Sequence, residues 1–89
     1  MPGSAPISAY VLITVPAKQS GDIVEILMDR YSDFVTEAAA VYGEADVIAK
    51  VETPSVESLH DLVMKSIQNL PNVKVTRTFI IIPQLHKTR

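Results

Sequence analysis

Apolar residues follow one another without alternation in the most strand-like segments of this chain. These segments are residues 10–13 (Tyr-Val-Leu-Ile), 47–48 (Val-Ile) and 79–82 (Phe-Ile-Ile-Ile). Because neighbouring residues of a strand point to opposite faces of a sheet, these segments place apolar side chains on both faces. A sheet built from them has to be covered on both sides, whereas 89 residues supply one domain of about two layers.

Four strands are predicted from β-branched and aliphatic runs that end at turn residues. They span residues 8–15, 34–42, 46–52 and 73–82, and Pro16 and Pro83 end the first and the last. Gly43-Glu44 is the predicted turn of a hairpin between the second and third strands. In the second strand, Glu37 is expected to share a face with Val35 and Ala39. Its carboxylate would then lie either under the sheet of a partner chain or in an ion pair at the rim of the interface.

Two helices are predicted between these strands. The first begins near Ser20 or Asp22, either of which can act as its N-cap, and the second begins with Thr53 as N-cap and Pro54 at its first position. Pro71-Asn72 ends the second helix. The predicted buried stripe of the second helix is Val56, Leu59, Leu62, Val63, Ile67 and Leu70, while His60, Gln68 and other polar residues are predicted to face water.

The order strand, helix, strand, strand, helix, strand predicts an α+β fold of the ferredoxin-like βαββαβ type. Its four-stranded antiparallel sheet would carry both helices on one face. The two-sided apolar strands then predict that the open face packs on the sheet of a second copy, because a monomer rarely exposes so large an apolar patch. The alternative is that the C-terminal tail, residues 84–89, folds over the open face.

We divide the chain into a disordered leader (residues 1–6), one domain (7–83) and a C-terminal tail (84–89). The leader lacks the basic start and apolar core of a secretory signal. No apolar run approaches the ~20 residues that cross a bilayer, and the absence of cysteine fits a reducing compartment. We therefore expect a soluble cytoplasmic protein with no membrane partner.

Charge and residue types exclude several classes of function. The formal charge is −2 and the basic residues form no cluster, so no direct contact with nucleic acid is expected. His60 and His86 have no ligand at metal-binding spacing, and no serine lies in a nucleophile elbow. We predict no catalytic residues, no metal and no cofactor.

The best candidate for a ligand site combines the hairpin turn with the last strand. Glu44 and Asp46 flank the turn, and Thr76 and Thr78 put two hydroxyl groups on one face of the last strand. Such groups could hold the ammonium and carboxylate of a small zwitterion. Each also has a structural explanation, since Gly43 suits a tight turn by itself and threonine is an ordinary strand residue.

The spacing of these residues resembles a known family. The chain reads apolar-x-Gly-Glu-x-Asp-apolar-apolar-x-Lys at residues 41–50 and Leu-Pro-x-Val-x-x-Thr-x-Thr at 70–78. Both segments are similar to the ligand-binding (RAM) domain of Lrp/AsnC transcriptional regulators. The resemblance covers residues 9–82. It departs from full-length members, because no DNA-reading helix-turn-helix precedes the domain and Ala45 stands at a position that is often aromatic.

The resemblance implies a ferredoxin-like domain that dimerises through its sheets as an α/β barrel and assembles into rings of dimers, as an octamer or decamer. It also implies an amino-acid effector bound at contacts between dimers. Carried over by position, the ligand-binding residues would be Tyr42, Gly43, Glu44, Asp46, Thr76 and Thr78.

We therefore expect an amino-acid-sensing oligomerisation module, not an enzyme, that modulates transcription or metabolism through partner proteins such as full-length Lrp/AsnC regulators. Two other functions stay open. One is a small dimeric α/β-barrel enzyme of monooxygenase or isomerase type, which would need a polar group or a histidine aimed into its core, where the predicted inward positions are aliphatic. The other is an assembly domain that binds no ligand.

Overall fold

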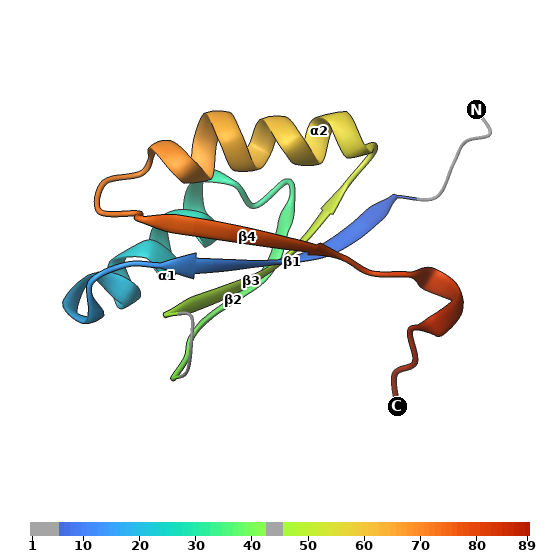
Figure 1. Ribbon diagram of the computed structural model, residues 1–89, viewed down its shortest axis with the longest axis horizontal. Helices are drawn as coiled ribbons and strands as arrows, with labels where there is room; N and C mark the ends of the chain where they lie inside the picture. Colours follow the sequence, from blue (N-terminus) through green and yellow to red (C-terminus); the bar gives the residue numbers. More distant parts are fainter. Residues whose placement is uncertain (1–5, 43–45) are drawn as a thin grey trace.

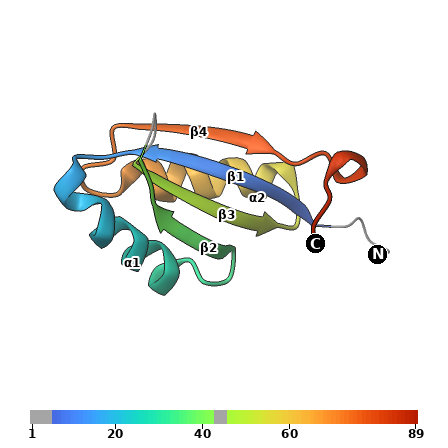
Figure 2. The same cartoon turned by 90° about the horizontal axis from the view of Figure 1, so that it is seen from below.

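The computed structural model describes residues 6–42 and 46–89 and confirms the predicted α+β fold. All strand pairs are antiparallel, and the strand order in the sheet is β2-β3-β1-β4. Figures 1 and 2 show the two long helices packed on one face of this sheet. The elements are β1 (Ile7–Thr14), α1 (Ser20–Arg30), β2 (Val35–Ala40), β3 (Val47–Thr53), α2 (Val56–Asp61) and β4 (Val75–Ile80).

Short helical turns complete the chain. A 3-10 turn, Ala17–Gln19, leads into α1, and another, Pro83–Leu85, follows β4. The helix α2 continues as a π-helical turn, Leu62–Ser66, and a 3-10 turn, Ile67–Asn69. The predicted turn after this helix is present, with Asn72 at a φ of 71°, a left-handed conformation that asparagine tolerates.

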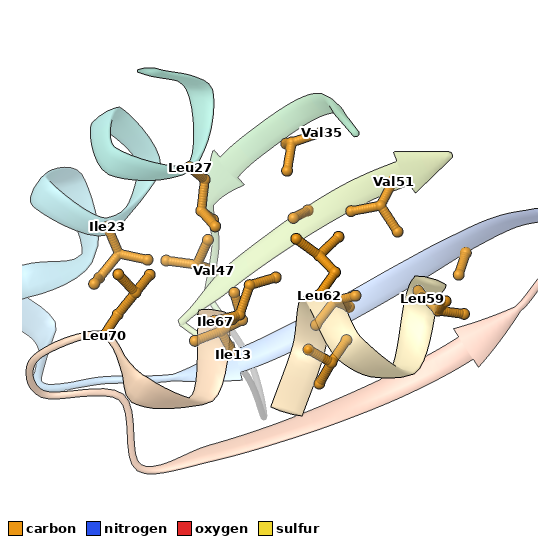
Figure 3. Close-up of a cluster of buried hydrophobic side chains, with 14 of the residues drawn as sticks. Ile13, Ile23, Leu27, Val35, Val47, Val51, Leu59, Leu62, Ile67 and Leu70 are labelled. Atoms are coloured by element: carbon orange, nitrogen blue, oxygen red, sulfur yellow. The ribbon is translucent and has the colours of Figure 1, made fainter. Parts of the chain in front are cut away.

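The hydrophobic core lies between the helices and one face of the sheet (Figure 3). Alternate residues of the two central strands point into it, and the helices supply the opposing layer. Fully buried side chains of this size each contribute about 1.5–3 kcal/mol relative to exposure, so the core is the main source of stability within one chain. Its members from the strands and from the residue after β1 are Ala9, Val11, Ile13, Val15, Val35, Val47, Ala49 and Val51, and those from the helical segments and the following turn are Ile23, Leu27, Leu59, Leu62, Val63, Ile67 and Leu70.

The other face of the sheet is open and carries a band of apolar side chains. Tyr10 lies opposite Phe79 on this face, and Leu12 lies opposite Ile48. Tyr10 is 38% exposed and Phe79 is 53% exposed. The tail after β4 leaves at the end of the sheet (Figures 1 and 2), and its residues 83–89 are all exposed. The alternative that the tail covers the open face is therefore wrong for the single chain.

The structure also corrects the predicted start of the second helix. Thr53 is not the N-cap but the last residue of β3, where it pairs with Ile7 of β1. Ser55 caps the helix, because its side chain accepts a hydrogen bond from the Ser58 backbone N–H at 3.1 Å. Val56 is then the first helical residue and is 55% exposed, not part of the buried stripe as predicted. Because Thr53 pairs with Ile7 of β1, β3 includes the residue that the Thr53-Pro54 sequence predicts as the helix N-cap.

Two smaller predictions are wrong for similar reasons. The N-cap of α1 is Gln19, without a side-chain cap hydrogen bond, because the chain already turns in a 3-10 helix and the Gln19 N–H donates to the Pro16 carbonyl. In β2, an irregularity between Val35 and Glu37 shifts the register. Val35 therefore faces the core while Glu37 lies opposite Lys50 on the open face, so these two residues do not share a face.

Replacing the capping serine tests the revised helix start. We expect Ser55→Ala to lower the free energy of unfolding by about 1 kcal/mol, because the Ser58 N–H loses its acceptor. At a fixed protein concentration, this corresponds to a fall in Tm of about 4–8 °C in a calorimetric scan. Ser55→Asp is the control, since aspartate also caps helices, and Thr53→Ala lowering Tm while Ser55→Ala leaves it unchanged would contradict the assignment.

Candidate functional site

A groove of about 310 Å³ runs between α2 and the edge strand β4. It arises because β4 has a strand neighbour on one side only, so its helix-facing residues are less covered than those of β1. We call it the α2–β4 groove. Its apolar lining residues are Val56, Leu59, Val63, Met64 and Ile80, and its polar ones are His60, Gln68, Thr76 and Thr78.

The two predicted threonines lie on the same face of β4 and both line this groove. The Thr76 hydroxyl donates a hydrogen bond to the Gln68 side-chain oxygen at 2.7 Å, which ties the strand to the end of the helix. Thr78 pairs with Val11 of β1 through the sheet and is exposed, and its hydroxyl makes no hydrogen bond to another residue in the described ranges. The Thr78 hydroxyl and the Gln68 amide hydrogens are thus available to a ligand.

The helix is irregular where it borders the groove. The Ile67 N–H bonds to the carbonyl oxygens of both Leu62 and Val63, so the turn Leu62–Ser66 is wider than an α-helical turn. This turn contains Val63 and Met64, which line the groove. Wide turns of this kind occur often at functional sites.

A second hollow, of about 350 Å³, lies at the other predicted site segment. We call it the turn hollow; Ser20, Ala40, Val41, Tyr42 and Asp46 line it. Tyr42 is fully exposed, whereas Asp46 is partly buried. Gly43 and Glu44 lie outside the described residues.

Asp46 is held firmly in place. Its backbone N–H donates to the Ile13 carbonyl at 3.0 Å, and its carboxylate accepts a hydrogen bond from the Val15 N–H at 3.0 Å. The Val41 N–H donates to the Asp46 carbonyl at 2.9 Å. One carboxylate oxygen thus has a structural role at the end of β1, and the other oxygen can accept a hydrogen bond from a ligand.

One chain does not bring all the predicted site residues together. Ile13 of β1 bonds to Asp46 on one side and pairs with Thr76 on the other. Two strand spacings therefore separate the Asp46 and Thr76 backbones, a distance of about 10 Å. On a single chain, the threonines and Asp46 therefore line two separate hollows.

The sequence prediction missed three residues of the groove. His60, Met64 and Gln68 recur every four residues, each one position after a buried residue of the same helix. His60 and Gln68 were expected simply to face water. The signal that could have found them is this stripe beside the buried one, on the helix next to an edge strand.

The described residues contain no group of three or more His, Asp or Glu side chains that could hold a metal ion. Within the same ranges, no helix is both long and apolar enough to span a membrane.

Comparisons with known proteins agree on one family. The model of the Lrp/AsnC ligand binding domain matches residues 8–89. A hypothetical protein from Pyrococcus horikoshii, PHS023, is 33% identical with a TM-score of 0.76, and the match covers 85% of this chain and 89% of that one. The protein FFRP-DM1 is also 33% identical, with a TM-score of 0.78 and coverage of 85% and 99%.

A third solved structure is a longer protein with a bound ligand. It is the feast or famine regulatory protein Rv3291c from M. tuberculosis complexed with L-methionine, 30% identical with a TM-score of 0.73. The match covers 93% of this chain and 54% of that protein. A search of curated proteins found no match. The family model and the identities to these structures show that the chain belongs to the Lrp/AsnC ligand-binding domain family.

Proposed function

We propose that this chain is an amino-acid-sensing assembly module that acts through partner proteins, among them full-length Lrp/AsnC regulators. The observation that carries the proposal is the division of the site. The groove with Thr76 and Thr78 and the hollow with Asp46 are separate on one chain. A ligand that needs both would bind only where subunits meet, and its binding would therefore be coupled to assembly.

The open face of the sheet supports association with a second copy. Tyr10, Leu12, Ile48 and Phe79 form an apolar band across three neighbouring strands. Covering it at about 800 Å² per partner would make an interface of ordinary size. The same face carries charges of both signs, Glu37 and Glu52 against Lys50 and Arg77, which two copies can pair around the apolar band.

In the proposed assembly, the turn hollow of one chain lies against the α2–β4 groove of a chain from another dimer. Asp46 and Glu44 would accept hydrogen bonds from the ligand ammonium, and backbone amides near Tyr42 and Gly43 would donate to its carboxylate. Thr76 and Thr78 would contribute from the groove. The M. tuberculosis relative complexed with L-methionine supports an amino acid as the ligand. Rings of four or five dimers are the proposed form of the assembly.

The buried core of the described residues offers no support for the enzyme alternative, and the polar residues between α2 and the sheet, His60, Gln68, Thr76 and Thr78, line an open groove. A barrel enzyme needs a polar side chain aimed into the space between sheet and helices. The buried polar residue there is Thr53, and its hydroxyl donates to the Ser55 carbonyl at 3.0 Å. Among the described residues the remaining buried side chains are apolar.

Association through the open face predicts a mutation that separates the subunits. At micromolar concentration, we expect the protein to sediment as a dimer or a larger assembly of dimers. Leu12→Glu should convert it to single chains, because the new carboxylate would be buried between two sheets without a partner.

Met28→Glu is the matched control, since Met28 is 39% exposed on α1, away from the open face. The proposal fails if the unmodified protein sediments as a single chain. It also fails if Leu12→Glu changes the sedimentation coefficient no more than Met28→Glu does.

A division of the site between chains predicts complementation between two defective variants. Asp46→Asn keeps an acceptor for the Val15 N–H but removes the charge, and Thr78→Val removes a hydroxyl without changing side-chain volume much. We expect each to weaken amino-acid binding about tenfold or more in titration calorimetry, because a buried hydrogen bond or ion pair is lost. Thr36→Val, on β2, is the control and should bind normally.

Mixing the two variants and allowing their subunits to exchange should restore normal affinity at about one site in four, the fraction of sites in which one chain supplies Asp46 and the other supplies Thr78. If each site lay within one chain, mixing would restore none. If titration with a mixture of amino acids gave no heat up to about millimolar concentration, the chain would be an assembly domain without a ligand.

A further inference from the structure

We propose that Gln68 is a positioning residue of the ligand site, which fixes the Thr76 hydroxyl so that its oxygen accepts a hydrogen bond from the ligand ammonium. This inference rests on the proposed function, in which Thr76 contributes to the site. Gln68 acts through Thr76 and makes no bond of its own to the ammonium.

The hydrogen of the Thr76 hydroxyl is already engaged. The hydroxyl donates to the Gln68 side-chain oxygen at 2.7 Å, the usual length of an O–H···O hydrogen bond. Both side chains are partly buried, which limits competition from water. The Thr76 oxygen keeps its acceptor capacity, so it suits a donor such as an ammonium group and not a carboxylate. An ammonium has three hydrogens, so Thr76 can bind it together with the carboxylates proposed at the turn hollow.

Thr78 differs from Thr76 although both lie on the same face of β4. Thr78 is exposed, and within the described part of the chain its hydroxyl has no hydrogen-bond partner that corresponds to Gln68. Its hydrogen can therefore turn toward a ligand carboxylate. The two threonines thus offer different groups to a zwitterion, and Gln68 is the cause of the difference.

The wide turn of the helix brings Gln68 to Thr76. On a regular α-helix each residue turns by about 100°, so His60 and Gln68, eight residues apart, would lie about 80° apart around the axis. The wide turn Leu62–Ser66 lies between them and takes up more of the chain than an α-helical turn does. It therefore turns the following residues back toward the side of His60, and both His60 and Gln68 line the groove beside β4.

The backbone around Gln68 is held on both sides. The Asn69 side-chain amide donates to the Lys65 carbonyl at 3.0 Å, and the Leu70 N–H donates to the Ile67 carbonyl at 3.1 Å. Ile67 is fully buried in the core. Gln68 therefore projects from a fixed backbone, which is the support that a precisely placed site residue needs.

The test replaces Gln68 in the full chain. Titration calorimetry with each common amino acid first identifies the one that the unmodified protein binds most tightly, and this compound is the probe. We expect Gln68→Met, which has no strong acceptor for the Thr76 hydroxyl, to weaken binding of the probe about three- to tenfold. Gln68→Glu keeps an acceptor and adds a negative charge near the ammonium, so it should bind within about twofold of the unmodified protein or more tightly.

Two further variants separate positioning from a merely structural role. In a Thr76→Val background, Gln68→Met should cause no further loss beyond about twofold, because Gln68 acts through the Thr76 hydroxyl. Gln84→Glu, the same charge change in the exposed tail, is the matched control and should leave the affinity unchanged.

Each contrary result has a distinct meaning. Unchanged affinity in Gln68→Met, or an equal loss with and without Thr76, would overturn this inference while leaving the proposed function standing. Weaker binding by Gln68→Glu than by Gln68→Met would also overturn it, because Thr76 would then face the ligand carboxylate. If the unmodified protein bound none of the common amino acids, both this inference and the proposed function would be wrong.

Discussion

Both faces of the sheet carry apolar side chains, but the helices of this chain cover only one of them. Within one chain, the core, from Ala9 to Leu70, lies between the covered face and the helices. The other face leaves Tyr10 and Phe79 side by side and exposed. Burial of apolar surface is the dominant favourable term in folding and association. The apolar side chains of the open face can contribute this stabilisation only when a partner chain covers them. Association is therefore part of how such a small domain reaches useful stability.

The position of β4 at the edge of the sheet has a second consequence. Its open-face residues, among them Phe79, contribute to the proposed dimer surface, while Thr76 and Thr78 on its other face line the α2–β4 groove. A single strand thus connects the association surface with the candidate ligand site. In such an arrangement, a change in how dimers meet would alter the site, and a bound amino acid would alter the assembly in return.

Most of the fold could be predicted from the sequence, because apolar periodicity and turn residues agree at nearly every element. The errors occur where tertiary pairing outweighs a local signal. Thr53 has the side chain of an N-cap, but its pairing with Ile7 keeps it in β3. Nothing in the alanine-rich sequence of β2 indicates the register shift between Val35 and Glu37. For the site, the shared face of Thr76 and Thr78 was predictable from strand alternation. The contribution of His60, Met64 and Gln68 was missed, because it depends on how closely α2 packs against the edge strand β4, which the sequence pattern does not specify.

The proposed assembly depends most on a second copy that covers the open face. Native mass spectrometry of the intact protein at micromolar concentration measures this directly, since each chain has a mass of 9.7 kDa. We predict an assembly with an even number of chains, and we predict that a saturating mixture of amino acids shifts the distribution of assemblies. A single species of 9.7 kDa, with or without amino acids, would contradict the proposed assembly.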